Sequence, residues 1–117
     1  MERWNRLHPD QEPRVPQVTS ILSDATGPVI AVSDYIRAVP EQIARFVPAP
    51  FIALGTDGYG RSDDREALRA FFETDAPNVV ITVLTELAAE GAIDRNVLVD
   101  AVKHYSLNTE LDAPWTR

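Results

Sequence analysis

Residues 54–63 read LGTDGYGRSD, a run that joins an apolar, β-rich segment to the expected start of a helix. Glycine occupies positions 55, 58 and 60. Because glycine tolerates positive φ angles and close backbone approach, a turn this rich in glycine indicates either a bound ligand or a tightly packed turn. Read outward from this turn, the flanking sequence predicts two strands and five helices.

Two short apolar runs upstream predict the strands, at residues 29–32 and 51–54. Between them, the apolar spacing over residues 36–46 predicts a helix. This helix is expected to kink or to begin at Pro40, since proline lacks the amide donor and clashes with the preceding turn. Helical spacing also predicts a short helix over residues 16–24.

Three further helices are predicted downstream. Ser62 is expected to cap the first, whose apolar stripe lies within residues 68–72. The second starts at residues 75–77 and ends at Gly91, and Asp94 caps the third. The order of elements places the chain in the α/β class, with a small, mainly parallel sheet of two clear strands covered by helices.

The ends of the chain carry weaker signals. Residues 1–14 contain two prolines and several charges and are expected to form an irregular lead-in, and residues 106–117 are expected to form a loose tail. Two strands provide too little sheet to occupy the apolar faces of five helices. Residues 1–117 are therefore expected to form one incomplete domain.

Composition excludes several classes of partner. The chain has 11 basic and 18 acidic residues and a net charge of -7, whereas a nucleic-acid or anionic-membrane surface calls for clustered cations. No apolar run approaches the length of a bilayer span, and no secretory signal precedes the domain. Cysteine is absent, which fits a reducing compartment, so a cytoplasmic location is expected.

The glycine turn does not match a known phosphate-binding fingerprint. Its spacing differs from the dinucleotide and P-loop motifs, no lysine follows, and Asp57, Asp63 and Asp64 would repel a phosphate. A cation held by these carboxylates is also disfavoured, because two of them are expected in the first turn of a helix. The turn is predicted to be a structural or interface loop comprising Gly55, Asp57, Gly58, Tyr59, Gly60, Arg61 and Ser62.

Catalytic chemistry is not indicated elsewhere. His8 and His104 are the only imidazoles and do not share a metal-ligand spacing, and the serines show no nucleophile-elbow pattern. The residues alone therefore predict no catalytic, cofactor-binding or metal site.

Several blocks of sequence nevertheless resemble one family, the homodimeric pyruvate dehydrogenase decarboxylating component. They match in order and spacing over nearly the whole chain, and they are ERWNRLHP (2–9), PRVP (13–16), VSDY (32–35), LGTDGYGRSD (54–63), FFE (71–73) and ELA (86–88). The resemblance implies the C-terminal end of a longer polypeptide of three α/β domains. The last of these is of the transketolase C-terminal type, and this chain is expected to start after the opening strand and helix of that domain.

The resemblance also implies a reaction carried out elsewhere in the polypeptide. The family oxidatively decarboxylates pyruvate with thiamine diphosphate and magnesium and passes the two-carbon unit to a lipoyl group on the acetyltransferase component. Its cofactor motif, Gly-Asp-Gly followed at a distance by Asn-Asn, is absent here, and Thr56-Asp57-Gly58 is only a near-miss. No catalytic, cofactor or magnesium residue can therefore be carried over.

The first hypothesis is thus a structural, dimer-supporting segment that partners the remaining domains, a second subunit and, by resemblance, the acetyltransferase component. The isolated chain is expected neither to turn over pyruvate nor to bind thiamine diphosphate. An alternative is a free-standing module that associates with itself or with a partner, motivated by exposed sheet edges and uncovered helix faces. A phosphate-binding enzyme built on the glycine turn is the weakest reading.

Overall fold

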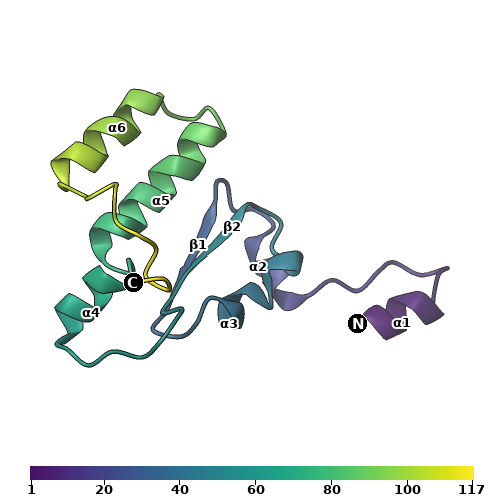
Figure 1. Ribbon diagram of the computed structural model, residues 1–117. Coiled ribbons are helices and arrows are strands. Elements are labelled where there is room, and N and C mark those ends of the chain that lie inside the picture. The colour runs from purple at the N-terminus through teal and green to yellow at the C-terminus, as the bar shows by residue number, and fades with distance from the viewer.

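Two short parallel strands form the sheet at the centre of the protein, in a computed structural model that describes residues 1–117 (Figure 1). β1 (Val29–Val32) pairs with β2 (Phe51–Leu54), with Val29 opposite Phe51 and Val32 opposite Leu54. The α/β class, the bounds of both strands and their parallel pairing are confirmed.

Helices surround this sheet unevenly. α5 and α6 pack side by side and α5 also lies against β1, whereas α3 approaches β2 (Figure 1). The helices are α1 (Glu2–Leu7), α2 (Gln17–Leu22), α3 (Ala38–Glu41), α4 (Arg65–Phe71), α5 (Ala76–Ala89) and α6 (Arg95–His104), with a 3-10 turn at Ala44–Phe46. None of them has the length and apolar content needed to cross a bilayer.

Aspartates fix the starts of the three downstream helices. The carboxylates of Asp75 and Asp94 accept hydrogen bonds from backbone amides of the following turn at 3.1 and 2.7 Å, so both predicted helix starts are confirmed. The prediction of Ser62 as the cap of α4 was wrong. Asp64 takes that position, because its extended backbone lets the carboxylate accept the Ala67 amide at 2.8 Å.

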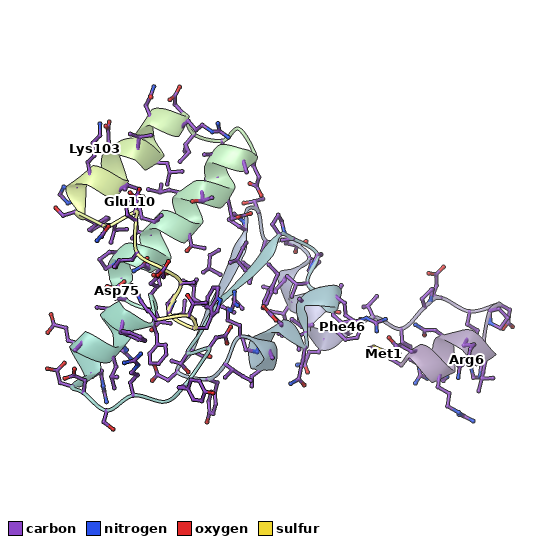
Figure 2. The ribbon with its side chains drawn as sticks, in the orientation of Figure 1. Met1, Arg6, Phe46, Asp75, Lys103 and Glu110 are labelled. Atoms are coloured by element: carbon purple, nitrogen blue, oxygen red, sulfur yellow. The ribbon has the colours of Figure 1, made fainter.

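The lead-in is more regular than the sequence predicted. Residues 1–14 were expected to be irregular, but Glu2–Leu7 forms α1, which stands apart from the body of the protein (Figure 2). The side chain of Asn5 both donates to and accepts from the main chain of Arg14, each at 2.9 Å. The Arg14 guanidinium lies 3.9 Å from the ring centre of Trp4. These contacts close the segment into a hairpin-like arm.

The helix predicted over residues 36–46 is divided into two short pieces. Pro40 is the third residue of α3, where its missing amide costs no hydrogen bond, and a 3-10 turn follows. The apolar side chains of Ile36, Val39 and Ile43 are 50%, 47% and 45% exposed. The face predicted to be buried is therefore open to solvent.

The core of the protein is small. Only 5 of 117 residues are buried, and the hydrophobic ones are Val47, Ala53 and Phe72. The radius of gyration is 17.8 Å, against about 13 Å expected for a compact domain of this length. The chain thus exposes much apolar surface that a self-contained domain would cover.

Candidate functional site

Two of the three glycines in the turn are required by close packing. A Cβ on Gly55 would lie 2.4 Å from the carbonyl oxygen of Tyr35 and 3.0 Å from the amide nitrogen of Arg37. Gly58 has a φ of 99°, and a Cβ there would lie 3.0 Å from the Cα of Trp115. The turn therefore packs on one side against the segment after β1 and on the other against the C-terminal tail.

Asp57 joins the turn to the segment after β1. Its Oδ1 accepts the backbone amide of Arg37 at 2.9 Å, and its Oδ2 accepts the guanidinium Nε of the same residue. Burial raises the pKa of Asp57, but the backbone hydrogen bond, the side-chain hydrogen bond and the positive charge of Arg37 outweigh it and lower the pKa below its ordinary value. The ionised carboxylate is thus the form that the fold stabilises.

This lowered pKa predicts a pH-dependent contribution to stability. Because the folded-state pKa lies below the unfolded value, the contribution is present above about pH 4 and is lost as pH falls through the folded pKa. Asp57→Asn is expected to lower the free energy of unfolding by about 1 kcal/mol at pH 7, a figure discounted because the Arg37 side chain is 38% exposed. Urea unfolding at pH 7 and pH 3 should show the difference shrinking at the lower pH.

Asp112→Asn is the matched control, since this exposed carboxylate makes no hydrogen bond or ion pair. It should leave the free energy of unfolding unchanged at both pH values. An Asp57→Asn effect of equal size at pH 3 and pH 7 would contradict the linkage.

The rest of the turn faces solvent or the tail. Tyr59 is 92% exposed, and both Gly60 and Ser62 are also exposed. The guanidinium of Arg61 donates to the main-chain carbonyl oxygen of Arg117 at 2.6 Å and lies 4.5 Å from the ring centre of Phe71. The tail that the sequence predicted to be loose contains no helix or strand, but it is held against the turn.

Arg117 and Trp115 make most of the other contacts of the tail. Arg117 Nη2 donates to the carbonyl oxygen of Phe71 at 2.8 Å and to Glu73 Oε1 at 3.3 Å. The Arg37 guanidinium lies 4.6 Å from the ring centre of Trp115. Pro114, which directly precedes Trp115, is buried. One cluster of contacts therefore joins Arg37 to residues 57–61, 71–73 and 114–117.

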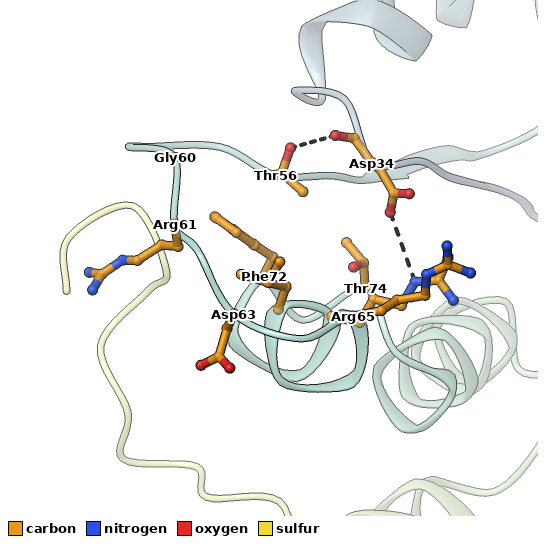
Figure 3. A pocket seen from close by; sticks show the side chains of 10 residues that line it. Asp34, Thr56, Gly60, Arg61, Asp63, Arg65, Phe72 and Thr74 are labelled. Carbon is orange, nitrogen blue, oxygen red and sulfur yellow. Dashed lines mark hydrogen bonds and ion pairs between the residues drawn. The ribbon is translucent and has the colours of Figure 1, made fainter.

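A cleft of about 460 Å³ lies beside the turn, between the carboxyl ends of the two strands and α4 (Figure 3). Thr56 and Asp34 form its strand side, where the Thr56 hydroxyl donates to the Asp34 carbonyl oxygen at 2.8 Å. Arg65 and Arg69 of α4 line the opposite side. Neither arginine was singled out from the sequence, although their spacing of four residues places them on one helix face.

The residues of this chain do not fit the cofactor that the resemblance implies. Both carboxylate oxygens of Asp57, the acidic residue of the near-miss motif, already accept hydrogen bonds from Arg37. Asp64 is engaged as a helix cap, and His8 Nδ1 lies 2.8 Å from the carbonyl oxygen of Trp4. No three or more acidic or imidazole side chains come together in an arrangement suited to a metal ion. These residues thus offer no set of ligands for magnesium and diphosphate.

Comparison with known proteins identifies the family. The family model for the transketolase-like TK C-terminal domain matches residues 1–75, which end at the cap of α5. The pyruvate dehydrogenase E1 component of Mycolicibacterium smegmatis is 51% identical to the chain over 108 residues, covering 92% of the chain and 12% of that protein. The same component from Cupriavidus necator is 50% identical over 114 residues, covering 97% of the chain and 13% of that protein.

A third relative is similar over most of the chain. The pyruvate dehydrogenase E1 component of Escherichia coli K12 is 46% identical over 110 residues, covering 93% of the chain and 12% of that protein. The chain thus spans about an eighth of the length of these relatives, and the similarity includes the α5–α6 region beyond the family model. The resemblance inferred from the sequence blocks is confirmed, and this chain belongs to the transketolase-like C-terminal domain family.

Proposed function

We propose that this chain is a C-terminal segment of a thiamine-diphosphate-dependent pyruvate dehydrogenase E1 component and that its role is structural. The observation that carries the proposal is the 51% identity to such a component over 92% of the chain. The turn residues from Gly55 to Ser62 act in this proposal as a fixed joint between strand, helix and tail. Oxidative decarboxylation of pyruvate, with its thiamine diphosphate and magnesium, belongs to the remainder of the polypeptide.

The exposed apolar surface supports a role in holding other parts of a larger protein. Ile36, Val39 and Ile43 form an exposed apolar face, and both edges of the two-stranded parallel sheet are unpaired. Both features are stabilised when other protein packs against them. We propose that the remaining domains of the same polypeptide and a second subunit supply this packing. The proposed location is the cytoplasm, and the acetyltransferase component is the proposed partner of the whole assembly.

A segment exchange tests this function. The matching part of the Mycolicibacterium smegmatis relative is either deleted or replaced by this chain, and dimer formation and pyruvate oxidation are measured. Deletion is expected to abolish the dimer and reduce activity by about 100-fold or more, because an apolar interface of the dimer would lose its partner surface. Replacement is expected to restore both.

Two further measurements sharpen the test. Calorimetry of the isolated chain with thiamine diphosphate and magnesium is expected to show no binding. Tight, magnesium-dependent binding would overturn the structural role, as would a deletion variant that keeps its dimer and its activity. A stable homodimer formed by the isolated chain, combined with failure of the exchange, would favour the self-association module instead.

A further inference from the structure

The cleft beside the turn occupies the edge of the sheet where ligands of parallel α/β proteins bind. Asp34 lies two residues beyond β1, and Thr56 lies two residues beyond β2, so both stand at the carboxyl ends of their strands. In open parallel sheets, ligands bind in the crevice outside these ends. Its volume of about 460 Å³ falls within the range of small-molecule sites.

Arg65 and Arg69 form a cationic ridge on α4. They are four residues apart, so their side chains lie on one face of the helix, and both line this cleft and a neighbouring one of about 500 Å³. The side chain of Arg65 makes no hydrogen bond and no ion pair. Arg69 has only a long ion pair, 3.9 Å from its Nε to Asp34 Oδ1 (Figure 3). Two guanidinium groups thus line the cleft, and the ion pair of Arg69 with Asp34 is the one ion pair that either of them makes.

The other charged groups of the cleft leave this ridge free. Arg61 points toward the C-terminal tail, where it donates to the Arg117 carbonyl oxygen (Figure 3). Asp63 accepts the amide of Asp64 at 2.9 Å and points away from the cleft (Figure 3). Within this cleft Asp34 is therefore the carboxylate that faces the ridge, and Glu66 and the helix-capping Asp75 line the neighbouring cleft.

Thr74 provides a second, independent indication of a missing ligand. It lines both clefts, it is 7% exposed, and its hydroxyl oxygen has no hydrogen-bond partner. A buried hydroxyl left unpaired costs about 1–3 kcal/mol. A ligand that lets this hydroxyl donate would remove that cost.

We propose that Arg65 and Arg69 bind the oxyanion of a small metabolite, a phosphate or carboxylate group, with Thr74 as an additional donor at the base of the cleft. Guanidinium groups recognise both kinds of oxyanion through paired N–H donors. The cleft is larger than an inorganic anion, and Asp34 and Thr56 can accept from hydroxyl or amine groups on the rest of the ligand. Gly55 and Gly58 take no part, since they pack against protein, and Gly60 is the one glycine of the turn that lines the cleft.

A titration of the full chain followed by NMR tests this site. Inorganic phosphate and malonate are the two probes, and sodium chloride at equal ionic strength is the reference. Saturable shifts of the Arg65 and Arg69 Nε–H signals are expected with at least one probe, and the tighter one identifies the oxyanion. Shifts that grow linearly with both probes, as with chloride, would overturn the proposal.

Substitutions separate a specific site from general attraction. Arg65→Gln is expected to weaken the binding about tenfold through loss of a charge-assisted contact. Arg95→Gln removes the same charge from the exposed start of α6 and is expected to leave the affinity unchanged. Equal affinities for the two variants would contradict the site.

Thr74→Val distinguishes a threonine that binds the ligand from one that only supports the fold. Removing the unpaired hydroxyl is expected to raise the melting temperature of the free chain and to weaken oxyanion binding about threefold. A variant that is more stable but binds as tightly as the original chain would exclude the threonine from the site. Circular dichroism of each variant confirms that its helices are retained.

Discussion

Replacing Gly55 by alanine is expected to lower the free energy of unfolding by about 3 kcal/mol, the upper end of the range for overpacking a closed site. The added methyl group would meet main-chain atoms, at 2.4 Å from the Tyr35 oxygen and 3.0 Å from the Arg37 nitrogen. A flexible side chain could move aside, but these atoms belong to the backbone. The Tyr35 oxygen also accepts the amide of Thr56 at 2.9 Å, so the two segments cannot separate without losing that bond.

Gly60→Ala is the matched control in the same turn. A Cβ there meets nothing within 4 Å, and Gly60 does not adopt a positive φ. Its effect on the free energy of unfolding is expected to stay within about 0.5 kcal/mol. Urea unfolding followed by circular dichroism compares the two variants, and a shared midpoint would show that the turn adjusts to the methyl group.

The same two substitutions can be made in the Mycolicibacterium smegmatis relative whose matching segment has been replaced by this chain. If the turn is the fixed joint proposed here, Gly55→Ala should reduce dimer formation, whereas Gly60→Ala should not. If the dimer forms equally well with both substitutions, assembly does not depend on the stability of the turn.

Elements determined by local sequence could be predicted. The strands at Val29–Val32 and Phe51–Leu54 follow from short apolar runs between turn residues. The helix starts at Asp75 and Asp94 follow from the capping preference of aspartate, and Gly91, with a φ of 75°, ends α5 as expected. In each case the deciding interaction joins residues close in sequence.

Elements held by pairing between distant residues could not be predicted. The two hydrogen bonds between Asn5 and Arg14 span nine residues, and the bond from Arg37 to Asp57 spans 20. Neither pairing leaves a periodic pattern in the sequence. The cap of α4 was misassigned because Ser62 and Asp64 carry the same preference, and only the backbone path decides between them.

The candidate site was predicted in part for the same reason. Three glycines in one turn drew attention to a segment that borders the cleft. The inference from their spacing that their backbone does not cradle a phosphate stays a prediction. The ridge of Arg65 and Arg69 could not be predicted, because arginines are scattered through this acidic chain and no spacing distinguishes this pair. Only the fold brings this pair beside Asp34 and leaves the Thr74 hydroxyl without a partner.

Arg117→Met is expected to lower the free energy of unfolding by about 2 kcal/mol, because it removes a charge-assisted hydrogen bond and leaves an acceptor unpaired. Arg117 joins the Phe71 carbonyl oxygen at the end of α4 to the carboxylate of Glu73. Glu73 has a φ of 58°, an uncommon value for a residue with a side chain. The two contacts of Arg117, here called the clasp, help to hold this backbone conformation. The methionine keeps most of the apolar stem and removes the donors.

Arg3→Met supplies the control, since Arg3 lies exposed on α1 and makes no hydrogen bond or ion pair. Urea unfolding should separate the two variants, and amide hydrogen exchange should show faster exchange at Thr74 and Thr116 in Arg117→Met alone. The amide of Thr74 donates to the Arg69 carbonyl oxygen at 2.9 Å, and that of Thr116 to Ala113 at 2.8 Å, so both report on the clasp. Equal exchange rates in the two variants would mean that the tail stays in place through Trp115 and Pro114 without the arginine.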